Sequence, residues 1–273
     1  MKILDLTEKH EPLYFHCLED WSDEMREAGD HKACWYREAR ENGLRVKLAA
    51  TDDGIIGGMI QYGPIEQSFA EGEDLYFIYC IWVHGYKQGR GNLQRQGMGK
   101  ALLRAAEQDT ELLGAKGIAA WGVILPFWMR ASWYRKQGFK SVDRQGIRSL
   151  LWKPYTPDAL PPRWPVQKRA VEPLPGKVTV DAFMNGWCPA QNLSYERAKR
   201  AAASFGNQVV FRETRTADRD TFRAWGISDA VYIDGKEINT GPPPAYEKIR
   251  KHIARRVKKR GRHPAGEHTD WHG

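Results

Sequence analysis

The stretch Gln94-Arg95-Gln96-Gly97-Met98-Gly99-Lys100-Ala101-Leu102-Leu103 decides how the chain is interpreted. Two glycines follow a run of polar residues and precede a helix predicted from Lys100 to Gly114 by its apolar spacing. A strand predicted over residues 75–83 comes before them. A strand, a glycine loop and a helix N-terminus together favour phosphate binding, because backbone N–H groups point outward and the helix dipole attracts negative charge. Short glycine runs also occur in ordinary turns, so other parts of the chain must support this interpretation.

The composition narrows the class of protein. At 273 residues, 41% of them hydrophobic, the chain is long enough for two domains with real cores. Its four cysteines are scattered, which favours a reduced, cytoplasmic protein over a disulfide scaffold. No apolar run suits a bilayer and no signal pattern is seen, so we expect no membrane partner. Much of the net charge of +8 falls between residues 248 and 262, where a solvated basic helix is favoured over nucleic-acid binding.

The first half of the chain alternates predicted helices and strands. The expected elements are helices up to residue 43, a hairpin of residues 45–50 and 55–62, the strand 75–83, the helix that follows the glycine loop, a strand at 117–123, a helix at 127–137 closed by Gly138, and a strand pair that ends near Trp152. This order predicts an α/β fold with one central sheet.

The element order and two short motifs resemble the GNAT acetyltransferases over residues 1–153. The acetyl-CoA loop of that family has Gln or Arg, two residues, Gly, one residue, then Gly or Ala, and Gln94 to Gly99 match it. The family pattern of Tyr, three residues, Gly and Phe is matched by Tyr134 to Phe139. The resemblance implies a mixed, splayed sheet flanked by helices. It also implies direct transfer of an acetyl group from acetyl-CoA to a primary amine in a ternary complex.

The resemblance also implies where acetyl-CoA would bind. The pyrophosphate would rest on the amides of residues 96–100, and the pantetheine arm would pair with the end of the strand 75–83. The expected binding residues are Ile81, Trp82, Val83, Gln94, Arg95, Gln96, Gly97, Met98, Gly99 and Lys100. A second glycine run, Gln88 to Gly91, could compete for the phosphates, but the predicted helix follows Gly99 and not Gly91.

The same comparison gives candidate catalytic residues. Tyr134 is the expected general acid for the departing thiolate. Glu73 (with Asp74 beside it) and His84 are candidates for the general base that deprotonates the amine, and each has a solvated loop residue as its alternative interpretation. Gly122 could permit the strand separation that admits the thioester. Aromatic residues near these positions favour a small molecule as the acceptor. A homodimer is left open. No metal site is expected.

A proline-rich linker at residues 154–176 separates a second predicted domain at 177–260, followed by a polar tail at 261–273 that we expect to be disordered. The second domain has a predicted β-α-β-α-β-β-α order, which resembles the thioredoxin fold. The segment Trp187-Cys188-Pro189-Ala190-Gln191 resembles the thioredoxin active site, with Gln191 in place of the second cysteine. The pair of domains resembles the YoaP-like acetyltransferases. Cys188 at a helix start is a candidate reactive thiol. The alternative function is therefore a thiol-reactive or redox protein with an acyl-CoA-sensing N-terminal domain.

Overall fold

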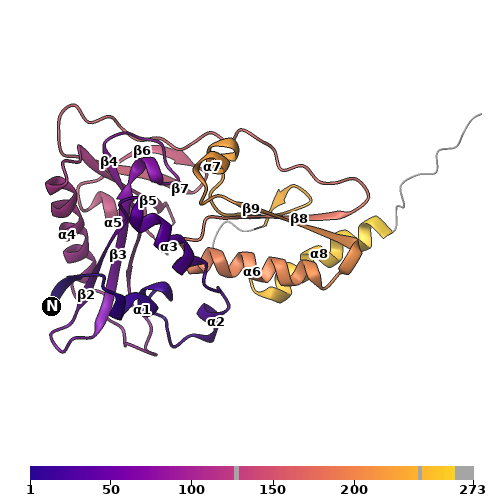
Figure 1. The fold of residues 1–273 in the computed structure, drawn as a ribbon, viewed down its shortest axis with the longest axis horizontal. Coiled ribbons are helices and arrows are strands. Elements are labelled where there is room, and N and C mark those ends of the chain that lie inside the picture. The colour runs from indigo at the N-terminus through magenta and orange to yellow at the C-terminus, as the bar shows by residue number, and fades with distance from the viewer. Residues whose placement is uncertain (126–128, 239–241, 262–273) are drawn as a thin grey trace, which may run out of the picture. The chain divides into compact units, whose positions relative to one another are not determined.

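The computed structural model describes residues 1–125, 129–238 and 242–261 (Figure 1). The chain divides into two compact units. The first contains Met1–Arg26 and Asp30–Val166, and the second contains Glu27–Gly29 and Gln167–Gly273.

A mixed sheet forms the centre of the first unit, with the strand order β1-β2-β3-β4-β5-β7-β6. Its strands are β1 (Lys2–Asp5), β2 (Arg45–Ala50), β3 (Ile56–Pro64), β4 (Leu75–Val83), β5 (Gly117–Val123), β6 (Lys140–Gln145) and β7 (Arg148–Pro154). Neighbours β4 and β5 run parallel, and the other neighbouring pairs are antiparallel. The predicted α/β class with one large mixed sheet is confirmed.

The two parallel strands pair over only part of their length. Register pairs run from Leu75 opposite Gly117 to Ile78 opposite Ala120, and then stop. Beyond that point β4 stays paired with β3, and β5 stays paired with β7. A bulge leaves Tyr79 as an extra residue on β4, and such a residue bends its strand. The carboxyl ends of β4 and β5 therefore diverge within an otherwise continuous sheet.

Helices cover both faces of this sheet (Figure 1). They are the short helices η1 (Glu8–His10) and η2 (Ile65–Gln67), with α1 (Glu11–Phe15), α2 (Asp23–Arg26), α3 (His31–Glu41), α4 (Met98–Leu112) and α5 (Ala131–Arg135). Adjacent residues of β3 show the two faces, since strand side chains alternate. The Gln61 amide oxygen accepts a hydrogen bond from Tyr14 of α1 over 2.7 Å, whereas Tyr62 donates to Asp109 of α4 over 2.7 Å.

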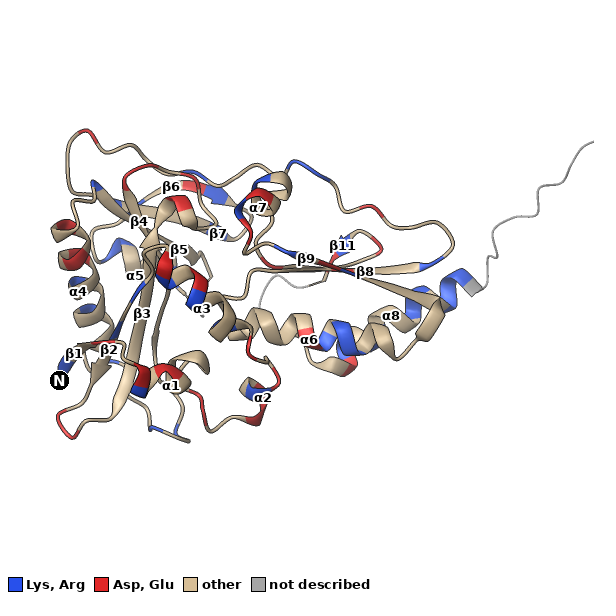
Figure 2. Ribbon diagram, in the orientation of Figure 1, with Lys and Arg blue, Asp and Glu red and all other residues tan. Residues whose placement is uncertain are grey.

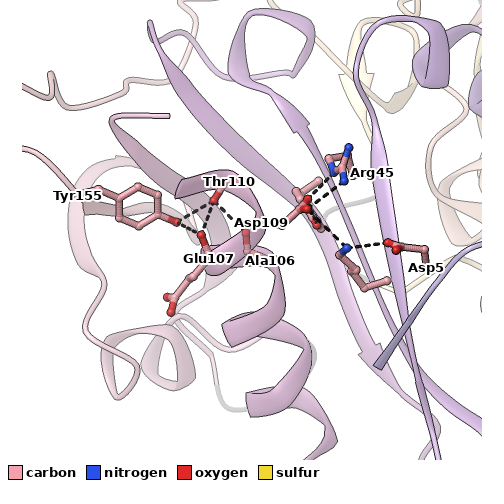
Figure 3. Close-up of polar contacts among 9 residues, drawn as sticks. Asp5, Arg45, Ala106, Glu107, Asp109, Thr110 and Tyr155 are labelled. Atoms are coloured by element: carbon pink, nitrogen blue, oxygen red, sulfur yellow. Dashed lines mark hydrogen bonds and ion pairs between the residues drawn. The ribbon is translucent and has the colours of Figure 1, made fainter. Parts of the chain in front are cut away.

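Helix α4 is held close to the sheet along its length. Its residues Leu102, Leu103 and Ala106 are buried. The helix lies so close to β3 that a methyl group at Gly58 would come 3.0 Å from Leu102. Near its C-terminus, Asp109 accepts hydrogen bonds from Arg45 of β2 (Figure 3). Burial opposes ionisation of Asp109, but the bonds from Arg45 and Tyr62 outweigh it and hold its pKa below the usual value. Both ends of α4 are thus fixed relative to β2 and β3.

The second unit contains a smaller sheet with the order β11-β10-β8-β9. Its elements are β8 (Val178–Met184), α6 (Pro189–Ala203), η3 (Gly206–Gln208), β9 (Val209–Arg215), α7 (Arg219–Trp225), β10 (Ala230–Ile233), β11 (Lys236–Glu237) and α8 (Tyr246–Gly261). Strands β8 and β9 are parallel, and β10 is antiparallel to β8. Alternate residues of β8 pack against α6 and α8, which makes the core. The predicted order of elements is confirmed, while the thioredoxin assignment stays a prediction.

Several boundaries differ from the sequence-based expectations. Strand β1 was not predicted, because four residues carry too little pattern; it forms by pairing with β2. The helix predicted over 127–137 is shortened to α5, since backbone at Met129 bonds to Val123 before the helix begins. Phe127 and Trp128 lie outside the described residues. Trp164, in the predicted linker, stacks on Phe69, so the start of that segment belongs to the first unit.

Lysine and arginine residues are frequent along α8, where the ribbon in Figure 2 is largely blue. Within the described ranges, no helix is both long enough and apolar enough to cross a membrane.

Candidate active site

The opening between β4 and β5 is the centre of the candidate site. Ile81, Trp82 and Val83 lie in the half of β4 that no longer pairs with β5, and each is half-buried. The indole N–H of Trp121 on β5 donates to the carbonyl of Tyr79 over 2.8 Å, so a side chain replaces the lost backbone pairing just past the fork. An extended ligand with amide groups would find strand edges here.

Helix α4 begins beside this opening with backbone N–H groups that lack helical partners. Its N-cap residue is Gly97, whose φ of +85° lies in the left-handed region, and no side chain caps the helix. The first helical bond found runs from Ala101 to the Gly97 carbonyl, so the amides of residues 98–100 precede it. Arg95 and Lys100 are exposed and add positive charge. The helix starts at Met98, two residues earlier than predicted, which places Gly99 inside its first turn.

The competing glycine run has other contacts. Gly89 lies against the indole of Trp21, and the carbonyl of Gly91 accepts a hydrogen bond from His84 over 2.8 Å. Between the two runs, the Gln94 side chain donates to the Val83 carbonyl over 3.2 Å. The start of α4 therefore belongs to the run at Gly97 and Gly99, as the sequence indicated.

Tyr134 of α5 brings an unpartnered hydroxyl to the site. The residue is 1% exposed, and its Oη is buried with no hydrogen-bond partner in the described structure. Burial, and then the nearby Cys80 of β4, raise its pKa well above the usual value. Its neighbour Trp133 lies over the start of α4, since a methyl group at Gly99 would come 3.4 Å from the indole. A protonated hydroxyl thus lies near β4, on a helix that also touches α4.

Trp82 carries a second buried donor without a partner, its indole Nε1. Buried polar atoms are almost always hydrogen-bonded, so two such atoms in one region need an explanation. A bound molecule with acceptor atoms would supply partners to both the Trp82 and the Tyr134 groups.

His84 is placed differently from the expectation of a general base. It is fully buried directly after β4, and its Nε2 lies 3.1 Å from the indole nitrogen of Trp21. An indole N–H can only donate, so Nε2 accepts, and Nδ1 then carries the proton donated to Gly91. Since the lone pair is already used, the geometry argues against His84 as the base.

Glu73 is also distant from the opening. It is exposed just before the first residue of β4, at the end where β4 and β5 are still paired. The strand between Glu73 and His84 has nine residues, which separates its two ends by roughly 30 Å. Asp74 beside it forms an ion pair with Lys116. Glu73 therefore lies at the end of β4 away from the opening, and its role as the base stays a prediction.

Gly122 has a packing role in the structure. A methyl group there would come 2.8 Å from the backbone nitrogen of Ala131 and the carbonyl of Met129. The glycine lets the segment entering α5 lie directly on β5, which positions Tyr134.

Three residues that the sequence did not single out also lie next to this region: Glu19, Trp21 and Tyr86. The first two lie between α1 and α2, and Tyr86 follows β4. Their signal in the sequence is a tryptophan, Trp21, inside the acidic run Glu19 to Glu24. Nothing local in that run indicates that it folds onto the loop after β4.

Comparison with known proteins decides the family of the first unit. A family model described as "Acetyltransferase (GNAT) family" matches residues 4–139. Residues 4–139 form a GNAT acetyltransferase domain. No curated protein matches the chain.

Solved structures also resemble the acetyltransferase domain at low identity. A GNAT-family acetyltransferase from Staphylococcus aureus is 13% identical, covering 57% of this chain and 99% of its own, with a TM-score of 0.42. A GNAT-family acetyltransferase from Brucella melitensis, solved with acetyl-CoA, is 18% identical over 59% and 90%, with a TM-score of 0.38. PaiA N-acetyltransferase from Thermoplasma acidophilum, solved with coenzyme A, is 18% identical over 57% and 100%, with a TM-score of 0.40.

Cys188 lies outside the acetyltransferase domain, at the N-cap of α6 in the second unit. It is a thiol, 5% exposed, and its side chain does not cap the helix. Next to it, the Trp187 indole donates to Asp229 over 3.0 Å, and Asp229 also accepts from the backbone of Asn185. The structure thus shows a buried cysteine in a tightly bonded loop. Across the described residues, no group of His, Cys, Asp and Glu has the arrangement of a metal site.

Proposed function

We propose that the acetyltransferase domain transfers an acetyl group from acetyl-CoA to a small primary amine by direct attack in a ternary complex. The observation that carries this proposal is the buried, unpartnered hydroxyl of Tyr134 beside the unpaired end of β4. A buried hydroxyl without a hydrogen-bond partner is unusual, and the sulfur of a thiol or thiolate in the opening would supply that partner.

The residues present fit acetyl-CoA. The uncapped amides at the start of α4 suit a pyrophosphate, and Arg95 and Lys100 add positive charge beside it. The free edge of β4 at Ile81, Trp82 and Val83 suits the amides of the pantetheine arm. When bound, acetyl-CoA supplies an acetyl group activated on a thiol leaving group.

In this proposal each residue has one role. Tyr134 gives its proton to the sulfur that leaves, and its raised pKa keeps that proton in place at neutral pH. A backbone N–H near Trp82 or Val83 polarises the carbonyl that the amine attacks. The half-buried strand end excludes much of the water that would hydrolyse the thioester.

For the second unit we propose a thioredoxin-like module that helps to present or select the acceptor. Support comes from the parallel β8 and β9 joined by α6, the antiparallel β10, and Cys188 at the start of α6. The 5% exposure of Cys188 favours a structural role for it over thiol chemistry.

The test is acetyl-CoA binding by calorimetry followed by CoA release against a panel of small amines. We expect binding, and release that depends on the amine. Absence of acetyl-CoA binding would overturn the proposal, as would CoA release at one rate whichever amine is added. Titration of Cys188 with a disulfide reagent tests the alternative of a redox protein. That alternative requires the folded protein to form a mixed disulfide rapidly.

A further inference from the structure

The segment between α1 and α2 is docked on the loop that follows β4. Trp21 donates to His84 over 3.1 Å, and Asp20 accepts two hydrogen bonds from Arg90 over 3.1 and 3.2 Å. The indole also lies where a methyl group at Gly89 would come 2.1 Å from it. Three separate contacts thus hold this segment beside the end of β4.

The docked segment builds an aromatic surface next to the proposed acetyl-CoA site. The ring of Tyr86 lies 5.7 Å from that of Trp21 and 6.3 Å from that of Trp82, measured between ring centroids. Trp21 is 36% exposed and Tyr86 is 44% exposed, so both present ring surface to solvent. Trp82 belongs to the unpaired part of β4, which connects this surface with the opening.

Glu19 is the unusual charged group of the segment. Its neighbours Asp20 and Asp23 form ion pairs with Arg90 and Arg26. In the described part of the chain the Glu19 carboxylate has neither a hydrogen bond nor an ion pair, although the residue is half-buried. Burial, and then the Glu24 carboxylate, raise its pKa to about 7.

These features suit an ammonium group. A half-buried carboxylate without a partner gains most when a cation arrives, and ring faces attract the same cation. A carboxylate whose pKa lies near the working pH can also accept a proton and later release it. Both alternatives from the sequence lack this geometry, since His84 has no available lone pair and Glu73 lies at the far end of β4.

We propose that Glu19 receives the ammonium group of a cationic alkyl amine and takes its proton, with Trp21 and Tyr86 as the aromatic walls of the acceptor site. This proposal rests on the proposed acetyltransferase function and adds to it the acceptor class and the base.

The step balances without another reagent. The ammonium proton moves to a carboxylate oxygen of Glu19, which leaves a neutral amine with its lone pair. The nitrogen forms a bond to the acetyl carbon, the carbon–sulfur bond breaks, and the sulfur takes the proton of Tyr134. The second proton lost by the nitrogen and the one held by Glu19 pass to solvent, which also reprotonates Tyr134.

The groups around Glu19 come from several elements. The groups whose charge interacts with Glu19 are Cys17 on its own segment, Glu24 of α2 and Tyr86 after β4. The cations Lys32 of α3 and Arg90 after β4 contact Cys17 and Asp20 of the same segment. Lys32 is bonded to the Tyr14 carbonyl and the Cys17 sulfur, and Arg90 to Asp20, so both cations have other partners. Glu24 is the group that acts on the Glu19 pKa from another element.

The experiment measures kcat/KM for acetylation of 1,4-diaminobutane against pH, in the wild-type chain, Glu19→Gln and Glu24→Gln. We expect a rise in the wild-type rate through a pKa near 7, and a loss of roughly 100-fold with no such rise in Glu19→Gln. In Glu24→Gln the rise should move to lower pH, because the neighbouring negative charge is gone. Infrared difference spectra between wild type and Glu19→Gln should show a carboxyl group titrating near pH 7 without any substrate.

The outcomes separate the two proposals. Unchanged kinetics in Glu19→Gln, or a carboxyl that titrates near its ordinary pKa, overturns the role of Glu19. Failure to acetylate 1,4-diaminobutane by a protein that binds acetyl-CoA and acetylates other amines overturns the acceptor class. Loss of acetyl-CoA binding in the wild-type chain would instead overturn the proposed function itself.

Discussion

The indole of Trp21 and the imidazole of His84 share a hydrogen bond of 3.1 Å that fixes how a fully buried histidine is protonated. With Nε2 accepting from Trp21 and Nδ1 donating to Gly91, the ring is neutral and fully bonded. The bond therefore joins the segment before α2 to the loop before α4.

Trp21→Phe should destabilise the acetyltransferase domain by about 1–2 kcal/mol, because Nε2 of His84 would be left buried without a partner. Urea unfolding of the full chain measures the change. Trp82→Phe is the matched control, since its indole nitrogen has no partner to lose. An equal loss of stability in both variants would show that ring volume matters and the hydrogen bond does not.

The local parts of this site could be predicted from sequence. The strand 75–83 is an unbroken apolar run, and its predicted bounds match β4 because the strand is buried over most of its length. The glycine loop was placed by the helix that follows it. The start of α4 differs by two residues, because a glycine with positive φ at Gly97 can end the loop before the apolar pattern begins.

The residues of the proposed acceptor site could not be predicted from sequence in the same way. Glu19 and Tyr86 are brought together by loops that are distant in sequence. The sequence predicts helix up to residue 43, whereas Glu19 lies in a loop between α1 and α2. The sequence indicated His84 from its intrinsic pKa, but its buried bonds with Trp21 and Gly91 depend on that same docking. Glu73 is close to β4 in sequence, and proximity in sequence does not say which end of a strand faces a site.

Gly122→Ala should be far more disruptive than Gly97→Ala. At Gly122 the added methyl group would meet backbone of residues 129 and 131 at 2.8 Å, so α5 must shift; we expect about 2–4 kcal/mol of lost stability. At Gly97 nothing lies within 4 Å, and only the strain of a φ of +85° remains, about 1–2 kcal/mol. Thermal unfolding compares the two. Gly97→Ala should weaken acetyl-CoA binding as well, since it changes the start of α4.

Glu19 should make stability depend on pH in a defined direction. Its pKa is about 7 in the folded chain against an ordinary 4.5, so the folded state binds the proton more tightly. The stabilisation from protonated Glu19 is complete below pH 4.5 and is lost as pH rises through 7. Relative to Glu19→Gln, which resembles the protonated form, wild type should lose about 1–2 kcal/mol between pH 4 and pH 8, after allowance for its partial exposure.

Denaturant unfolding of both proteins at each pH measures that difference, and the comparison cancels the other titrating groups. Glu24→Gln is the control within the same segment: by removing the neighbouring charge it should shrink the loss without abolishing it. A constant difference between wild type and Glu19→Gln across this range would contradict the raised pKa.

Tyr134→Phe should separate stability from activity. The variant removes a buried hydroxyl that has no partner, so the folded state should be unchanged or more stable by up to about 1 kcal/mol. Acetyl transfer should slow by roughly 10- to 100-fold, because the departing sulfur loses its proton donor while remaining able to leave as a thiolate. Tyr155→Phe is the matched control, since its hydroxyl is 2.9 Å from Thr110 on α4: it should lose stability and keep its rate. A Tyr134→Phe protein that is destabilised at full activity would mean that the hydroxyl serves the fold and not the reaction.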